Sequence, residues 1–148
     1  QSRVAGSHSG GDTDQPPMTN DGPLDALALA AVAAVTGAWP KQPDMNRKTY
    51  IARNGKRFHL RTYDPESARF FGINERCWKP HEYFVLACGG EIALFVVPVG
   101  ALPEPSEFPL RGNDRLIHIE CQGGVWYVRD PDPRFLLTNY RDAFDLLI

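Results

Sequence analysis

The chain is poor in cysteine, and the few cysteines present do not pair by spacing. Cys77, Cys88 and Cys121 are odd in number and form no C-x-x-C motif. A disulfide framework and a zinc ribbon are therefore not expected, and a reducing, cytoplasmic location is the natural one. We expect all three cysteines to serve as small core residues rather than as nucleophiles.

A long hydrophobic run is also missing. The longest apolar stretch runs from Leu24 to Val35 and is interrupted by Asp25. It is shorter than the about 20 residues that a helix needs to cross a bilayer. It also lacks the basic flank of a signal peptide. The sequence therefore gives no reason to expect a membrane partner.

The sequence lacks the motifs of common catalytic and cofactor sites. It contains no G-x-S-x-G, no P-loop and no G-x-G-x-x-G. His59, His81 and His118 are far apart and show no H-x-x-x-H spacing. We therefore expect no metal site and no cofactor, and a binding role is favoured over an enzymatic one.

Charge is present, but it is unevenly distributed. The formal net charge is −2 at pH 7. Residues 41–80 hold ten basic and four acidic residues, a net charge of +6, whereas residues 81–148 hold five and ten, a net charge of −5. Such polarity is a hint about binding partners rather than about fold.

The length of 148 residues suits one domain. Residues 1–22 are rich in Gly, Ser, Asp and Pro and have almost no apolar side chains. They are predicted to form a flexible tail, because they cannot bury enough apolar surface to offset the entropy of ordering. Residues 23–148 are predicted to form a single globular domain.

The first predicted element of this domain is a helix. Pro23 suits the first helical position, and apolar residues recur at three- and four-residue spacing from Leu24 to Val35. Gly37 suits the C-terminal cap, and Pro40 blocks continuation. The small side chains of this helix favour close packing against a sheet.

Three units of similar design follow the helix. In each, two segments rich in Val, Ile, Phe and Tyr flank a turn that contains glycine. Asn54-Gly55 is the strongest turn signal, because a type I′ turn needs positive φ at both central residues. The other turns are expected at Gly89-Gly90 and Gly123-Gly124. The three hairpins are predicted over residues 48–63, 82–99 and 115–129.

The predicted fold class is α+β: a mostly antiparallel sheet or half-barrel of three β-hairpins, with an N-terminal helix and a short C-terminal helix. A closed or nearly closed β-barrel is the main alternative. The C-terminal helix is expected within residues 138–147, and another short helix within 64–71. The second hairpin is almost wholly apolar, so we expect it at the centre with both faces covered.

The basic segment is the strongest candidate for a functional surface. Cations contact phosphates, aromatic side chains stack on exposed bases, and a two-stranded ribbon can enter a duplex groove. The alternative is a solvated charged face over an aromatic core. The candidate nucleic-acid-binding residues are Arg47, Lys48, Tyr50, Arg53, Lys56, Arg57, Arg61, Arg69, Trp78 and Lys79.

A second cluster stands at the entry to the middle hairpin. Trp78, Lys79, His81 and Glu82 lie close together in sequence, and such a cluster could line a pocket. Adjacent residues of a strand point to opposite faces, so His81 and Glu82 cannot act together as acid and base within a strand. A structural role at the strand entrance is favoured.

One family resemblance rests on the first two hairpins. The run Tyr50–Phe58, the run HEYFVL at 81–86 and the run ALFVVPV at 93–99 resemble the back half of PD-(D/E)XK nuclease-like proteins. In that family a strand hairpin leads to a "DYF-V" strand and to a strand that ends in "IPV". The resemblance covers about residues 47–99 and implies a DNA-related setting such as restriction or repair. The catalytic signature, an acid followed by E-x-K, is not found upstream of this region.

Three functions follow from these observations. The favoured one is a non-catalytic DNA-binding domain, a recognition module of a restriction or defence system. The first alternative is a degenerate or variant magnesium-dependent nuclease that uses Asp114, Glu120 and Gln122, although this E-x-Q form follows the matched region, in the wrong order. The second alternative is a protein-interaction module whose polarised surface, +6 against −5, pairs with a complementary protein or with a second copy of itself.

Overall fold

The computed structural model describes residues 22–44, 47–63, 70–78, 82–89, 92–130 and 133–148. One α-helix is followed by strands and short 3₁₀ helices, and the predicted α+β class is confirmed. The predicted flexible tail, except for Gly22, lies outside the described residues.

Helix α1 (Pro23–Thr36) begins and ends close to the predicted bounds. Gly37 follows it in the left-handed conformation, with φ of 83°, and its N–H donates to the carbonyl of Ala33 at 2.9 Å. In the described part of the chain, no helix is long and apolar enough to cross a membrane. The apolar stripe that α1 buries consists of Ala28, Leu29 and Val32.

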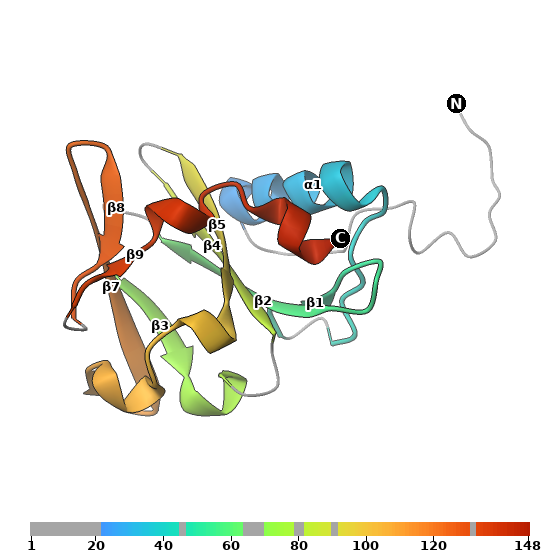
Figure 1. The fold of residues 1–148 in the computed structure, drawn as a ribbon. Helices are drawn as coiled ribbons and strands as arrows, with labels where there is room; N and C mark the ends of the chain where they lie inside the picture. The colour runs from blue at the N-terminus through green and yellow to red at the C-terminus, as the bar shows by residue number, and fades with distance from the viewer. Residues whose placement is uncertain (1–21, 45–46, 64–69, 79–81, 90–91, 131–132) are drawn as a thin grey trace, which may run out of the picture.

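The strands form two sheets, sheet A and sheet B (Figure 1). Sheet A has the order β1 (Thr49–Ile51), β2 (Arg57–Tyr63), β4 (Tyr83–Cys88) and β5 (Ala93–Pro98). Sheet B has the order β3 (Phe70–Asn74), β7 (Asp114–Gln122), β8 (Val125–Val128) and β9 (Phe135–Leu136), with β6 (Leu110–Arg111) also paired to β7. Among the described strands, only the β2–β4 pair is parallel.

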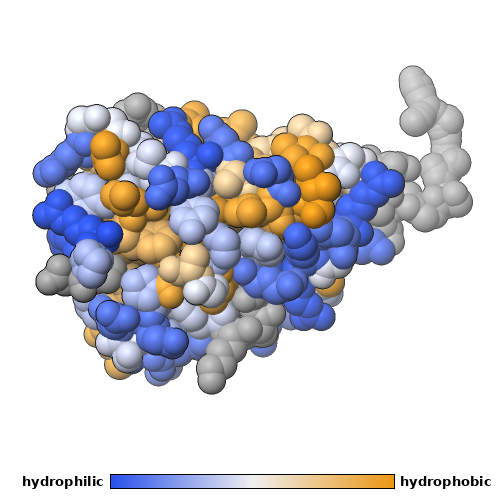
Figure 2. All heavy atoms as spheres, viewed as in Figure 1, coloured by the Kyte–Doolittle hydropathy of each residue, from blue (hydrophilic) through white to orange (hydrophobic). Residues whose placement is uncertain are grey.

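Strands β4 and β5 of sheet A are buried on both faces. Val85 and Ala87 of β4 contribute to a core with α1, whereas Phe84, Leu86 and Cys88 contribute to a core with sheet B. Figure 1 shows α1 and the C-terminal turns over one face of sheet A, and sheet B at the end away from the β1–β2 hairpin. Apolar side chains remain visible at the surface over α1 and the C-terminal turns (Figure 2). Both faces of the second hairpin are covered, as predicted, but only β4 is an inner strand, because β5 is the last strand of sheet A.

All three predicted hairpins are present, as β1–β2, β4–β5 and β7–β8. The turn types differ from the prediction. Gly55 has φ of 91° but Asn54 does not have positive φ, and the N–H of Gly55 donates to the carbonyl of Ala52 at 2.8 Å. This is a turn over residues 52–55 followed by a glycine bulge. The two-residue turn with positive φ at both positions is instead Gly123-Gly124.

Two predicted helices take another form. Phe70 and Phe71, placed in a short helix by the sequence, lie in β3, and residues 64–69 are outside the described part. The predicted helix over 138–147 is divided into two 3₁₀ helices, η6 (Thr138–Tyr140) and η7 (Phe144–Leu147). The reason is a pairing with β5: the N–H of Asp142 donates to the carbonyl of Leu94 at 2.8 Å.

The Pro-rich segment between β5 and β7 consists of short regular elements rather than one irregular loop. It contains two short 3₁₀ helices and one short strand. The helices are η4 (Val99–Ala101) and η5 (Pro105–Glu107), and the strand is β6. Another 3₁₀ helix, η3 (Glu75–Cys77), follows β3.

A buried ion pair joins α1 to the start of β1. The Nζ of Lys48 lies 2.6 Å from Oδ2 of Asp25, whose side chain is 4% exposed. We expect Lys48→Ala to lower the free energy of unfolding by about 2–3 kcal/mol, because it leaves a buried carboxylate without its cation. Urea unfolding of the variant measures this loss. The double variant Asp25→Asn, Lys48→Ala should recover part of it.

Arg47→Ala is the matched control for Lys48→Ala. The neighbouring Arg47–Asp44 pair is solvent-exposed, at 3.4 Å and with 66% and 50% of the two side chains accessible. Its removal should change the free energy of unfolding by at most about 0.5 kcal/mol. Equal losses of stability in the two variants would contradict a special role for the buried pair.

Candidate nucleic-acid interface

The two aromatic candidates of the basic segment are core residues. Tyr50 is fully buried and stacks on Phe58, with ring centroids 5.5 Å apart. Trp78 is 4% exposed and packs edge-on against Phe84 at 5.2 Å and, tilted, against Phe108 at 5.5 Å. Neither ring presents a face to solvent, so neither can stack on a base as the sequence predicted.

Four of the basic candidates have partners within the fold. Lys48 binds Asp25, and Arg47 binds Asp44. The Nη1 of Arg53 donates to the carbonyl of Thr36, at the C-terminal end of α1, at 3.5 Å. The partners of Lys56 are the carbonyl oxygens of Leu146 at 2.9 Å and of Ile148 at 3.3 Å. Part of the basic charge therefore stabilises structure.

Arg57 and Arg61 are the basic candidates for which the described part of the chain offers no side-chain hydrogen bond or ion pair. Both lie on β2, where side chains alternate between the two faces of sheet A. Phe58 and Leu60 point into the core with α1, so Arg57, His59 and Arg61 share the other face. Arg57 is exposed, His59 is 7% exposed and Arg61 is half-buried.

Lys41 extends this face, although it is not among the candidates predicted from the sequence. Its backbone exchanges two hydrogen bonds with Ile51 on the outer edge of β1, at 2.9 and 2.8 Å. Ile51 in turn is opposite Arg57. Residues directly opposite in antiparallel strands share a face, so Lys41 and Arg57 belong to one cross-strand row. Lys41, Arg57 and Arg61 together form what we call the cationic face.

The nearest acid in register with this row is Glu82. Its carboxylate accepts a hydrogen bond from the backbone N–H of Arg57 at 3.3 Å, rather than from the guanidinium. Glu82 and Trp78 also line a hollow of about 360 Å³ with Leu102 and Glu104. Trp78 and Glu82 thus line a hollow, as in the alternative to a structural role at the strand entrance. Lys79 and His81 lie outside the described residues, as does Arg69.

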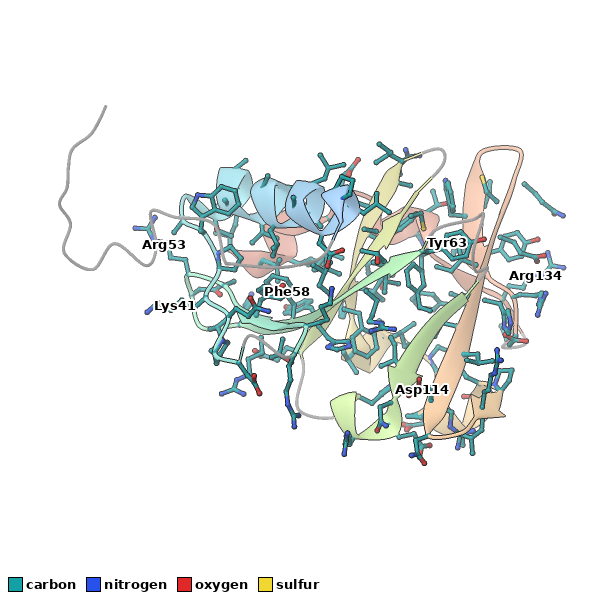
Figure 3. The ribbon with its side chains drawn as sticks, turned by 180° about the vertical axis from the view of Figure 1, so that it is seen from behind. Lys41, Arg53, Phe58, Tyr63, Asp114 and Arg134 are labelled. Carbon is teal, nitrogen blue, oxygen red and sulfur yellow. The ribbon has the colours of Figure 1, made fainter. Side chains whose placement is uncertain are left out.

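The cationic face begins with Lys41 at one end of the molecule and runs along β2 toward Tyr63 (Figure 3). Figure 3 shows Lys41 and Arg53 at the end formed by the first hairpin, and Arg134 at the opposite end, beside sheet B. Arg134 lies over the ring of Tyr127, with its Cζ 4.5 Å from the ring centroid. The two ends therefore offer cations in different settings, which provides a natural comparison.

The carboxylates of the nuclease alternative do not converge. Asp114 begins β7, and Glu120 lies six residues further along the same strand, so their Cα atoms are about 20 Å apart. Glu120 lies opposite Tyr127 of β8 rather than beside a second carboxylate. Burial, and then a hydrogen bond to Glu120, raise the pKa of the Tyr127 phenol above its ordinary value. Within the described residues, no three His, Cys, Asp or Glu side chains form a group that could hold a metal ion.

The two cysteines whose side chains are described differ in environment. Cys88 is buried in the core between the sheets, and burial raises the pKa of its thiol to about 12, with Arg141 opposing the shift. Cys121 is exposed. The expectation of a small core residue is confirmed for Cys88, whereas Cys121 lies at the surface near the end of β7.

The sequence matches no protein-family model and no curated protein. The resemblance of residues 47–99 to PD-(D/E)XK nuclease-like proteins therefore stays a prediction.

Thiol labelling tests the two cysteine environments. In a Cys77→Ser background at pH 8, we expect one fast-reacting thiol, which Cys121→Ser removes and Cys88→Ser leaves unchanged. The thiolate is the reactive form, and a thiol with a pKa of about 12 stays protonated at this pH. Raising the pH to about 9 should not expose a second fast thiol, because that pH is still well below the raised pKa. Comparable labelling rates for Cys88 and Cys121 would contradict the burial of Cys88.

Proposed function

We propose that this chain is a non-catalytic nucleic-acid-binding domain whose cationic face contacts the phosphate backbone. The observation that supports it is the row of cations on one face of sheet A with which no described carboxylate forms an ion pair, since Glu82 accepts from the backbone N–H of Arg57 instead. Elsewhere in the chain, Lys48 and Arg115 are each matched with an acid, Asp25 and Glu75. Cations left without acids on one surface attract a polyanion and neutralise its charge.

The buried aromatic rings define the kind of binding. Tyr50 and Trp78 are not available for stacking, so contacts to phosphates would supply most of the affinity. Phosphate contacts fix position and orientation but carry no direct sequence information. Binding should therefore be strongly salt-dependent and only weakly selective for sequence.

The biological setting follows from the family resemblance rather than from the site. In this setting the domain would be a non-catalytic recognition module of a cytoplasmic restriction or defence system, and it would act by binding DNA. The proposal includes no bond cleavage, because Asp114 and Glu120 are too far apart on β7 to bind one metal ion.

Removing the exposed cations of the face should weaken binding. We expect the double variant Lys41→Ala, Arg57→Ala to bind a labelled oligonucleotide roughly three- to tenfold more weakly per removed charge at low salt. The slope of log K against log salt should fall by about one for each phosphate that the variant no longer neutralises. Fluorescence anisotropy over a salt series measures both quantities for single-stranded and duplex DNA.

The matched control removes two cations from the opposite end. Arg129→Ala, Arg134→Ala changes the net charge by the same amount at exposed positions near sheet B. Its affinity should fall much less, and its salt slope should stay that of the parent chain. Equal reductions of affinity in the two double variants would mean that net charge alone governs binding. Absence of any binding at low salt would refute the proposed function.

A further inference from the structure

Arg61 differs from the other cations of the face, because its guanidinium is partly withdrawn from water. The side chain is half-buried and its Nε has almost no accessible surface. That Nε–H donates no hydrogen bond to any group in the described part of the chain. In register, its neighbour on β4 is Leu86, which is fully buried and offers no side-chain acceptor.

A partly buried cation without an acceptor is unfavourable, since the protein replaces water without supplying a hydrogen bond or a counter-charge. The chain avoids this elsewhere. Arg115, whose side chain is 17% exposed, donates to Glu75 at 2.8 Å and to the carbonyl of Phe108 at 2.9 Å. Lys48, 27% exposed, meets Asp25. Arg61 is thus a charge for which an anion at its terminal Nη groups would be favourable, because the anion would supply the counter-charge that no described residue provides.

More cations surround Arg61. Arg57 lies four residues earlier on the same face of β2, which places their Cα atoms about 13 Å apart. The N–H of Leu60 donates to the carbonyl of Lys48 at 2.9 Å, so the antiparallel pairing continues past the end of β1. This brings the backbone of the exposed Arg47 alongside that of Arg61. An anion at Arg61 would therefore also interact with the charge of Arg57 and, more weakly, with that of Arg47, which is paired with Asp44.

We propose that Arg61 is the binding site, called the seat below, for a terminal phosphate monoester. This inference rests on the proposed function and names the group that the cationic face accepts. A guanidinium can bind phosphate through two parallel hydrogen bonds, and for Arg61 the donors would be Nη1 and Nη2, since the Nε has no surface that a ligand could contact. A phosphate monoester at the end of a nucleic-acid strand carries more charge than a phosphodiester of the backbone, and it is attached to the nucleic acid on one side only. It can thus enter a half-buried position, whereas internal diesters remain on the exposed Lys41 and Arg57.

Two sources carry the same chemistry: the phosphorylated end of a nucleic-acid strand and a free nucleoside monophosphate. Anisotropy with one oligonucleotide sequence, with and without a 5′-phosphate, tests the first source. The parent chain should bind the phosphorylated form roughly ten- to a hundredfold more tightly, the value of a charge-assisted bidentate contact. Arg61→Met should abolish the difference, whereas Arg57→Met should weaken both forms alike.

A nucleoside monophosphate, used as the probe in thermal unfolding, tests the second source. It should raise the Tm of the parent chain and not that of Arg61→Met. In the absence of ligand, Arg61→Met should raise the Tm, because it removes a poorly solvated charge. A marked drop in its unliganded Tm would overturn the proposal, since the guanidinium would then be a structural group.

The outcomes separate this inference from the proposed function. If both oligonucleotides bind equally and Arg61→Met affects them equally, Arg61 is an ordinary backbone contact, and only the seat is overturned. If no oligonucleotide binds but the nucleoside monophosphate binds through Arg61, the seat is supported and the nucleic-acid function is overturned. If neither probe binds, both proposals fail.

Discussion

The parallel pairing of β2 with β4 is the constraint on which the rest of the architecture depends. A tight turn cannot connect two parallel neighbours, so the chain leaves sheet A after Tyr63, forms β3 in sheet B and returns at Tyr83. This crossover ties the two sheets together and encloses Trp78 in the core between them. It also makes β2 an inner strand, so Arg57 and Arg61 project from a rigid element rather than from a loop.

Local signals in the sequence predicted the elements well. Pro23 and Gly37 bound α1, and glycine turns mark the three hairpins, because each of these features depends on neighbouring residues only. The parallel pair escaped prediction, since it joins segments separated by β3 and by residues without periodic signal. For the same reason one expected sheet became two, and the 138–147 helix was interrupted where Asp142 pairs with Leu94.

The candidate site was predicted in location but not in composition. The charge count drew attention to residues 41–80, yet charge alone does not distinguish a cation that binds a neighbour from one that faces solvent. Lys48 and Lys56 have structural partners more than twenty residues away. Lys41 joins the face through an isolated bridge to Ile51, and no pattern in the sequence predicts this bridge. Burial of Tyr50 and Trp78 likewise depends on the packing of both sheets.

The contact of Lys56 with the last turn has a consequence for the order of folding. Its ammonium group binds the carbonyl of Leu146, ninety positions along the chain, and this contact closes a loop that contains nearly every strand. Closing so long a loop is entropically costly, so we expect this contact to form after the local contacts of the hairpins. The turn that aligns β1 with β2 is thus tied to η7 through the hydrogen bond of Lys56. Local opening of η7 would loosen this turn, so mobility at residues 144–147 and at 52–56 should be coupled across the molecule.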